Sequence, residues 1–421
     1  MKPICKLLLV LGALSLTIAL VMTFNGSLPQ AGYCYILFLL SLAIGAREFE
    51  ATKGISFTLL IFSAVVAAMF YPAPFVSIGG FQLKYLIVPL IQIIMFGMGS
   101  QMSMEDFTGV IRMPKGVIVG VGAHYIIMPL IAFGISNIFD FPPEVKAGII
   151  LIGCVPSGLA SNVMSYIANA NLALAVTVGA ISTLLSPFVT PFLMKWLGGQ
   201  YIEVHFWHMM FDILNMIILP IVAGFIFNLF AGGTAKRRGI AVQMSVYFII
   251  IVLTNLVSHQ DRTPNGSTFL TALSTLLFYF YVLPFAGALA VRYFSKDHSL
   301  WLPKALSLIS MAGIAFIVTI IVASGRDSLL KVGALLVITS LLHNLAGYAL
   351  GYGVSWMCGM PEKDRRTVAF EVGMQNGGLA SGLALQMGKV TTVGLAPAIF
   401  GPLMNMTGAA LAAFWRNRKT D

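Results

Sequence analysis

Residues 371–381 read Glu-Val-Gly-Met-Gln-Asn-Gly-Gly-Leu-Ala-Ser, and this stretch decides how the rest of the sequence is interpreted. It lies inside an apolar segment, yet it carries an acid, two amides and two adjacent glycines. At membrane depth, a carboxylate and backbone groups released from a helix are costly unless they bind something. The stretch therefore predicts a binding site for a transported ion.

Composition places the chain in a membrane. The 421 residues are 58% hydrophobic and 10% charged, with a mean hydropathy of +0.91. A soluble protein of this size could not cover so much apolar surface with polar groups. Apolar runs of about 20 residues, the length that spans a bilayer, recur along the chain. We therefore predict an all-α polytopic membrane protein without a soluble or enzymatic domain.

The net charge of +10 and the four cysteines have simple interpretations. Lys and Arg gather in cytoplasmic loops of membrane proteins, so the charge indicates topology rather than nucleic-acid binding. The cysteines are scattered without metal-type spacing and predict no disulfide framework. Residues 1–24 resemble a signal peptide but lack an A-x-A cleavage site, so we expect a retained first helix.

The hydropathy pattern predicts fourteen helices. They fall at 5–24, 33–46, 54–72, 84–104, 116–138, 146–168, 172–196, 207–231, 239–258, 268–293, 304–324, 329–356, 366–388 and 390–415. The segment 33–46 is short for a span and could be re-entrant. If all fourteen cross and the N-terminus is cytoplasmic, 18 Lys and Arg lie inside and 7 lie outside. Leaving out 33–46 spoils this bias, so the charges favour crossing, with both termini cytoplasmic. Without a transit-like N-terminus, we expect a bacterial inner membrane.

A short internal sequence repeat suggests a duplicated structural unit. Residues 158–161 and residues 378–381 both read Gly-Leu-Ala-Ser, in helices predicted to run in opposite directions. Each helix is interrupted, at 156–158 and at 375–378, and each is followed by a helix that contains prolines. Paired interrupted segments of this kind point to the midplane site of a transporter. We predict two inverted five-helix repeats, 54–196 and 207–231 with 304–415. Two extra helices would precede them in 1–53, and an inserted pair would occupy 239–293.

Glu371 is the candidate cation ligand. Gln375 stands at i+4 on the same helical face, and Gly377-Gly378 allows the backbone to turn its carbonyl oxygens toward a cation. Since Arg365-Arg366 precede Glu371 by a turn and a half, the carboxylate could instead reach the inner surface or mark a structural kink.

Helix 146–168 offers a second set of polar residues, namely Ser157, Ser161, Asn162 and Ser165. Pro156 interrupts the backbone hydrogen bonds of this helix. Two facing breaks also expose helix N-termini, whose N–H groups attract anions. A cation site beside an anion site is the chemistry of cation-coupled anion uptake.

Four further polar residues lie in apolar segments. His124 and the pair His343-Asn344 lie near the middle of their helices. A lone membrane histidine is more often a hydrogen-bonded packing group than a ligand. Asp212 lies near the start of its helix and is interpreted as an interfacial residue.

At these residues the sequence resembles the bile acid:sodium symporter family. The matching strings are 94–99 (IMFGMG), 156–166 (PSGLASNVMSY), 342–344 (LHN) and 371–380 (EVGMQNGGLA). The resemblance covers about 54–230 and 300–415. It implies a panel domain, a core domain and two crossing discontinuous helices, here 146–168 and 366–388.

The resemblance also implies two sodium sites around the crossing. Ser161, Asn162 and Glu371 match the first site. Glu371, Val372, Met374 and Gln375 match the second, with Val372 and Met374 acting through their carbonyls. Asn376 and Asn405 are similar to amides that face substrate, beside Gly378 in the same break. Leu159 stands where a small hydroxyl is common and suggests a less polar or narrower pocket.

The chain departs from the family pattern at three positions. Ala175 and Gly179 stand where hydroxyls are frequent, and His124 stands where a glutamine completes the second sodium site. Nitrogen is a poor sodium ligand, and a histidine can carry a proton. Thr177 or Ser182 could replace the missing hydroxyls if the helix shifts its register. One sodium site, two sodium sites or proton coupling are therefore all open, with His124 as a candidate ligand.

Three functions compete. The first is a secondary active transporter that carries an organic anion, such as a bile acid, a steroid or a small carboxylate, with Na⁺ by alternating access. The second is proton-coupled or uncoupled transport of an organic anion through the same fold. The third is a membrane receptor or scaffold that no longer transports. The intact 371–380 string favours transport, and the sequence leaves the substrate and the oligomeric state open.

Overall fold

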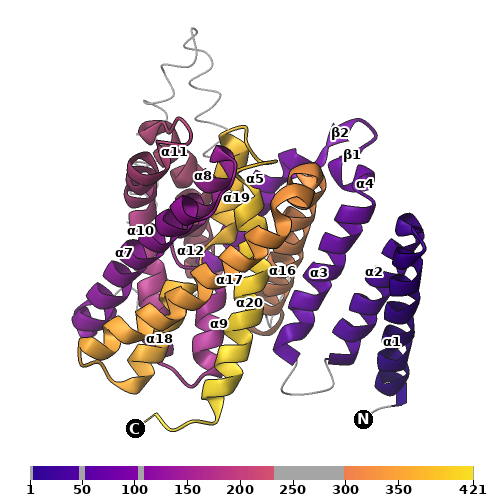
Figure 1. Ribbon diagram of the computed structural model, residues 1–421. Coiled ribbons are helices and arrows are strands. Elements are labelled where there is room, and N and C mark those ends of the chain that lie inside the picture. The colour runs from indigo at the N-terminus through magenta and orange to yellow at the C-terminus, as the bar shows by residue number, and fades with distance from the viewer. Residues whose placement is uncertain (1–2, 47–52, 103–108, 232–297, 421) are drawn as a thin grey trace.

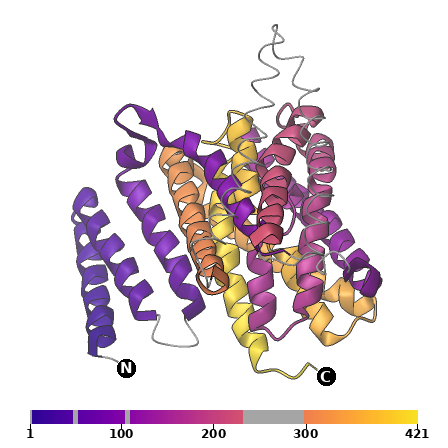
Figure 2. The same cartoon turned by 180° about the vertical axis from the view of Figure 1, so that it is seen from behind.

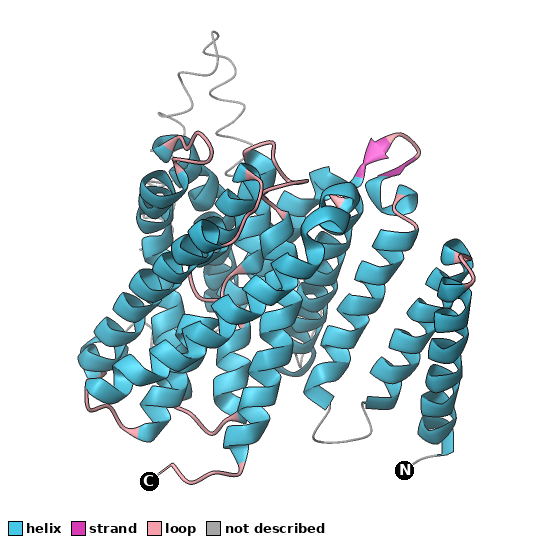
Figure 3. Cartoon of the chain, viewed as in Figure 1, coloured by secondary structure: helices cyan, strands magenta, loops and turns pink. Residues whose placement is uncertain are grey.

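The computed structural model describes residues 3–46, 53–102, 109–231 and 298–420. Apart from one short hairpin, the secondary structure in these ranges is helical (Figures 1 and 3). Both ends of the chain lie at the same end of the molecule in Figure 1. The predicted inserted helices, 239–258 and 268–293, lie outside the described residues.

Three helices follow one another at one edge of the molecule (Figures 1 and 2). They are α1 (Pro3–Phe24), α2 (Leu28–Gly45) and α3 (Lys53–Phe70), and each packs on the next. The turn after α1 uses Gly26 at φ +77°, a conformation that suits glycine. Because α2 begins at Leu28 rather than at residue 33, its 18 residues are long enough to cross a bilayer.

A β-hairpin leads from α3 into the next membrane helix. After the short helix α4 (Ala73–Val76), β1 (Ser77–Ile78) pairs antiparallel with β2 (Phe81–Gln82). Gly79 and Gly80 form the two-residue turn with φ of +57° and +86°, as a type I′ turn requires. A 3₁₀ turn at Leu83–Leu86 then leads into α5 (Ile87–Gly99).

Four helices, α3, α5, α12 and α16, form what we call the four-helix group. Helix α11 (Phe206–Ile213) passes through a π-helical turn into α12 (Leu219–Ala231), and α16 (His298–Ser324) packs on both α3 and α5. A Cβ on Gly224 would lie 2.1 Å from the carbonyl oxygen of Phe96, so only glycine allows α12 to approach the α5 backbone this closely.

Eight helices form the crossing group, which contains both interrupted segments. They are α7 (Pro114–Ile138), α8 (Pro143–Cys154), α9 (Ala160–Ile167), α10 (Leu172–Leu193), α17 (Arg326–Met357), α18 (Glu362–Gly373), α19 (Gly377–Gln386) and α20 (Leu395–Arg416). Helices α7 and α17 pack on each other and on α18, while α20 packs along α8, α9, α17 and α19. In Figure 1 this group lies on the side of α16 away from α1 and α2.

The all-α membrane architecture is confirmed. Within the described residues, seven helices are long and apolar enough to cross a membrane, and three shorter apolar helices accompany them. Every predicted span inside the described ranges has helical structure at its place. The predicted spans 146–168 and 366–388 are each two helices, interrupted where the sequence indicated. Buried apolar side chains from both groups form one core cluster.

Candidate functional site

The two helix breaks cross and bond to each other. Ser157 and Gln375 form an antiparallel bridge between the breaks. The Gly158 N–H donates to Met374 O at 3.1 Å, and the Asn376 N–H donates to Pro156 O at 2.8 Å. These bonds replace the intrahelical bonds that both segments lose where their helices stop. Two segments more than 200 residues apart therefore share one polar centre.

Local sequence explains why the breaks form here. Proline disfavours a helical conformation in the residue before it, and Val155, before Pro156, is extended at φ −78° and ψ 159°. Gly158 lets the second segment approach, because a Cβ there would lie only 2.5 Å from Gln375 O. On the other segment, Asn376 caps α19 by accepting a hydrogen bond from Leu379 N at 3.0 Å.

The carbonyl groups freed at the two helix ends are mostly occupied by donors from other helices. Cys154 O, at the end of α8, accepts a hydrogen bond from the Thr190 hydroxyl at 2.8 Å. Gly373 O, at the end of α18, accepts one from the Asn344 amide at 2.8 Å. Sequence reasoning named neither Thr190 nor the capping role of Asn344, because each contact joins distant parts of the chain. The lone amide in apolar α17 was the available signal for Asn344.

The side-chain oxygens at the crossing have no such donors. Both carboxylate oxygens of Glu371, the amide oxygens of Gln375 and Asn162, and the Ser165 hydroxyl are buried without a hydrogen-bond partner. Glu371 and Gln375 have no exposed surface. Leaving buried acceptors unsatisfied costs about 1–3 kcal/mol each, more for a charged group. These oxygens obtain partners only when a cation or a hydrogen-bond donor binds among them.

The oxygens fit a hard monovalent cation such as Na⁺. Carboxylate, amide, hydroxyl and carbonyl oxygens are the ligands that hard cations prefer. The hydroxyls of Ser157 and Ser161 lie beside the Glu371 carboxylate. The Ser161 hydroxyl donates to Gly158 O at 2.7 Å, which leaves its lone pairs free for a cation. Glu371 has no exposed surface and so does not reach the outside of the molecule, and Arg366, five residues earlier, pairs with Glu362 at 2.8 Å.

Helix α10 borders the carboxylate without offering a hydroxyl. A Cβ built on Gly179 would lie 3.6 Å from Glu371 Oε2, so this glycine faces the acid directly. Ala175, one turn earlier, is fully buried. The hydroxyls of Thr177 and Ser182 donate to backbone carbonyls of their own helix, at 2.8 Å and 3.0 Å. The register of α10 thus does not bring them into the places of the missing hydroxyls.

Of the carbonyls expected to face a cation, two are already engaged. Val372 O accepts a hydrogen bond from the Gln375 amide at 3.1 Å, and Met374 O accepts the Gly158 N–H. A carbonyl oxygen has two lone pairs, so each keeps one for another partner.

His124 is fully buried, with Nδ1 2.8 Å from Glu371 O and Nε2 2.9 Å from Val155 O. His343 contacts Met128 O at 3.0 Å and packs beside Phe400, as expected of a packing group.

A cavity that is partly open to solvent, with about 710 Å³ of empty space including that opening, lies between the crossing and the four-helix group. Its wall on the crossing side contains the expected substrate residues Leu159, Asn376, Gly378 and Asn405. Its opposite wall consists of apolar side chains from α5 and α16, namely Ile91, Ile94, Met95, Ile314, Ile317 and Val318. Among the described residues, no charged side chain lines the cavity.

Comparison with known proteins agrees with this geometry. The model of the "Sodium Bile acid symporter family" matches residues 87–262. The uncharacterized sodium-dependent transporter YocS of Bacillus subtilis (strain 168) is 31% identical over 373 residues, which cover 88% of this chain and 94% of that protein. The chain belongs to the sodium bile acid symporter family.

Two plant relatives are more distant. The probable sodium/metabolite cotransporter BASS1 of Arabidopsis thaliana, a chloroplast protein, is 28% identical over 324 residues, covering 77% of this chain and 65% of that protein. The probable sodium/metabolite cotransporter BASS2 of Oryza sativa subsp. japonica is 28% identical over 330 residues, covering 77% and 62%. Membership of the symporter family makes the chain a membrane transporter rather than an enzyme.

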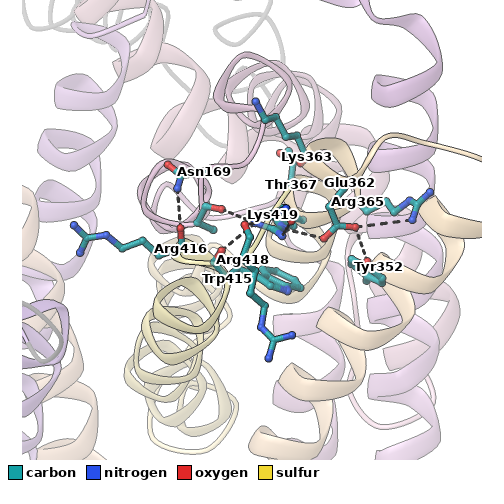
Figure 4. Close-up of polar contacts among 12 residues, drawn as sticks. Asn169, Tyr352, Glu362, Lys363, Arg365, Thr367, Trp415, Arg416, Arg418 and Lys419 are labelled. Carbon is teal, nitrogen blue, oxygen red and sulfur yellow. Dashed lines mark hydrogen bonds and ion pairs between the residues drawn. The ribbon is translucent and has the colours of Figure 1, made fainter. Parts of the chain in front are cut away.

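Polar contacts at the end of the molecule where the C-terminus lies join the crossing helices of this symporter-family chain to its C-terminal tail (Figure 4). The guanidinium of Arg366, 1% exposed, donates to Ala168 O at the end of α9 and to Trp415 O near the end of α20, at 3.2 Å and 3.0 Å. It also donates to Lys419 O in the C-terminal tail at 2.7 Å. A buried cation thus caps two helix C-termini at once. The Tyr352 hydroxyl donates to Glu362 at 2.6 Å, and Figure 4 draws this contact as a dashed line.

The opposite end of the crossing is held by an ion pair. Lys389, in the loop after α19, pairs with Glu144 in the first turn of α8. The hydrogen bond from the Lys389 ammonium is the main reason that the pKa of Glu144 lies below its ordinary value. At the end where the C-terminus lies, Asn171, after α9, donates to Asp364 in the first turn of α18 at 2.7 Å. In each interrupted segment, an acidic residue of the first turn therefore contacts the loop that follows the other interrupted segment.

Proposed function

We propose that this chain is a secondary active transporter that carries an organic anion together with Na⁺ by alternating access. The observation that carries the proposal is the set of buried, unpartnered oxygens of Glu371, Gln375 and Asn162 at the crossing. We further propose that the chain is a multi-pass protein of a bacterial inner membrane, with both termini cytoplasmic.

The carboxylate supports coupling to a cation. A buried carboxylate without a partner is unfavourable in a low-dielectric environment, and a bound cation removes much of this cost. With the cation bound, the crossing regains the bonds that its interrupted helices lack. The names of the relatives YocS and BASS1 include sodium, which supports Na⁺ as the coupling ion. Residues Ser161, Asn162, Glu371 and Gln375 are the proposed ligands.

The cavity supports an amphipathic anion as substrate. The oxygen of Asn376 is occupied as a helix cap, so its NH₂ group, which only donates, remains for a ligand. The N-terminus of α19 begins beside it at Gly377 and adds the positive end of a helix dipole. The opposite wall is apolar and suits a hydrocarbon body. We therefore propose a carboxylate with an apolar body, held by amides and helix ends rather than by Arg or Lys.

Helix contacts support alternating access. Helix α19 lies against α5, α11 and α16, whereas the neighbours of α9 with extensive contacts in the described residues are α10, α18 and α20. Helix α19 thus packs against the four-helix group, whereas the close neighbours of α9 all belong to the crossing group. We interpret the four-helix group as the panel and the crossing group as the core, which would rock against each other.

A constant offset supports the inverted repeats. Gly158 and Gly378 differ by 220 in number, and so do His124 and Asn344. Both members of the second pair contact carbonyls at the end of an interrupted helix. Equivalent positions of two repeats would have this relation. We propose repeats at 54–196 and at 207–231 with 304–415.

Ligand-dependent stability tests the proposal. A ligand present at 100 times its dissociation constant stabilises the native state by about 2.7 kcal/mol. A thermal-shift screen of bile acids, steroid sulphates and short carboxylates, in NaCl and in choline chloride, should find an anion whose effect requires Na⁺. The same anion should enter proteoliposomes when a Na⁺ gradient is imposed. Uptake that proceeds equally well in choline chloride would contradict sodium coupling.

Proton coupling is the second candidate, and His124 is the observation that favours it. Both of its ring nitrogens lie within 2.9 Å of carbonyl oxygens, which cannot donate. A neutral imidazole has one N–H, and only a protonated ring donates at both nitrogens. Uptake driven by a pH gradient in choline chloride would favour this candidate. No observation favours a receptor or scaffold over transport.

A further inference from the structure

His124 occupies the position where the two interrupted helices leave backbone oxygens exposed. Val155 O follows the last residue of α8, and Glu371 O lies in the last turn of α18. In a continued helix, the Gln375 N–H would bond to Glu371 O, but it contacts the Met404 sulfur at 3.3 Å instead. Freed carbonyl pairs of this kind are typical cation ligands at broken membrane helices. Here the imidazole of His124 bridges the pair, at 2.8 Å and 2.9 Å.

We infer that His124 takes the place of a second cation, so that the chain binds a single Na⁺, at the Glu371 carboxylate. The inference rests on the proposed function and concerns how many ions that function uses. In this account the imidazole is a tethered donor that joins α7 to both breaks, and it is not a sodium ligand. A ring nitrogen that donates its proton to a carbonyl has no lone pair left for an ion.

The carboxylate and the carbonyl of Glu371 face different neighbours, which separates the two positions. The carboxylate lies beside Gly179 of α10 and the hydroxyls of Ser157 and Ser161. The carbonyl oxygen of the same residue contacts His124 of α7. An ion held by the carboxylate therefore leaves the His124 contacts intact. A second ion between Val155 O and Glu371 O would have to displace the ring.

Charge balance also limits the crossing to one ion. Among the described residues, Glu371 is the one acid in the buried set. One carboxylate offsets one monovalent cation, and a ring that donates at both nitrogens already carries a positive charge, so a second bound cation would add to the uncompensated charge in a low-dielectric interior. Gly179 and Ala175 offer no hydroxyl oxygen on α10 that could share the charge. The donor set thus suits a single ion.

Direct binding of ²²Na⁺ to the purified protein tests the inference without a substrate. We expect wild-type protein to bind one Na⁺ per chain with a hyperbolic isotherm, and Glu371→Gln to lose it. His124→Gln removes the ring and supplies an amide oxygen near the freed carbonyls. We expect this variant to bind two Na⁺ per chain, with a Hill coefficient that rises above one. His343→Gln is the matched control, because it removes a buried histidine that contacts Met128 O and neither break.

Each result has a distinct meaning. Two ions bound to wild-type protein, or one ion still bound to folded His124→Gln, would overturn the inference and leave the proposed function standing. Loss of all Na⁺ binding in His124→Gln, with an unchanged melting profile, would show that the ring is itself a ligand and would also overturn it. No saturable binding to wild-type protein would contradict the proposed function itself. The wild-type stoichiometry decides the question even if His124→Gln does not fold.

Discussion

One added methyl group at Gly158 tests whether the two breaks cross as tightly as described. A Cβ on this residue would lie 2.5 Å from Gln375 O and 3.0 Å from the Gln375 carbonyl carbon. Ordinary van der Waals contact begins at 3.4 Å. Gly158→Ala therefore requires the two segments to separate by roughly 0.9 Å, since neither neighbour is the end of a flexible side chain.

The separation acts on the hydrogen bonds that join the breaks. Gly158 N to Met374 O is 3.1 Å and Asn376 N to Pro156 O is 2.8 Å. Lengthened by about 0.9 Å, neither contact remains a hydrogen bond. An unsatisfied buried backbone group costs about 1–3 kcal/mol, and overpacking costs a similar amount. Because the segments can relax partly, we expect a loss of about 3 kcal/mol in the free energy of unfolding.

Thermal unfolding in detergent, with and without Na⁺, measures this loss and any loss of ion binding. Gly122→Ala is the control, because a Cβ there has nothing within 4 Å. Alanine is preferred over glycine inside a helix, so the control should melt at or above the wild-type temperature. If Gly158→Ala melted within about one degree of wild type and bound Na⁺ with unchanged affinity, the close approach of the two breaks would be refuted.

The remaining predictions concern the ion ligand and the two ends of the crossing. Glu371→Gln keeps the shape of the side chain and removes its charge, so the apparent Na⁺ affinity should fall about 100-fold, or about 3 kcal/mol; equal affinity in a ²²Na⁺ titration would exclude the carboxylate as a ligand. Arg366→Gln removes the buried guanidinium that pairs with Glu362 and caps α9 and α20, and it should lower stability by about 3 kcal/mol, measured by thermal unfolding. Deleting residues 418–421 removes only the tail contacts and should cost less, and an equal loss would argue against the helix-capping role. Glu144→Gln should cost about 1 kcal/mol or less at pH 7, since the pair with Lys389 is partly exposed. Because the pKa of Glu144 lies below its ordinary 4.5, the ion pair should stabilise the protein above pH 4.5, and this stabilisation should disappear as the pH falls below that value. If Glu144→Gln were still less stable than wild type in acid, the ion pair would not be the source of the difference.

The helix breaks were predictable because their causes are local. Pro156 restricts the residue before it, and Gly158 and Gly377 permit backbone conformations and approaches that other residues resist. The length and hydropathy of the spans follow equally from the local sequence, which is why the predicted helices agree with the described ones to within a few residues. The start of α2 at Leu28 was missed because Pro29 in its first turn resembles a breaker, although proline is well tolerated there.

The details of the proposed ion site were less predictable. The sequence identified Glu371, Gln375, Ser161 and Asn162, but not which of their oxygens lack partners. Whether Thr177 or Ser182 could approach Glu371 depended on the register of α10. That register follows from how α10 packs on α7 and α18, and no property of residues 172–193 alone determines it.

The sequence by itself determined that this chain is a bundle of membrane helices with two interruptions and one acid beside them. Those features come from apolar length, from proline and glycine chemistry and from the cost of charge in lipid, which act within one segment. Only the tertiary structure decided that the interruptions meet, that His124 bridges two of the carbonyls they release, and that the Glu371 carboxylate is left without a donor. The physical reason is that a hydrogen bond depends on positions within a fraction of an ångström, and residues more than 200 apart acquire such positions only through packing.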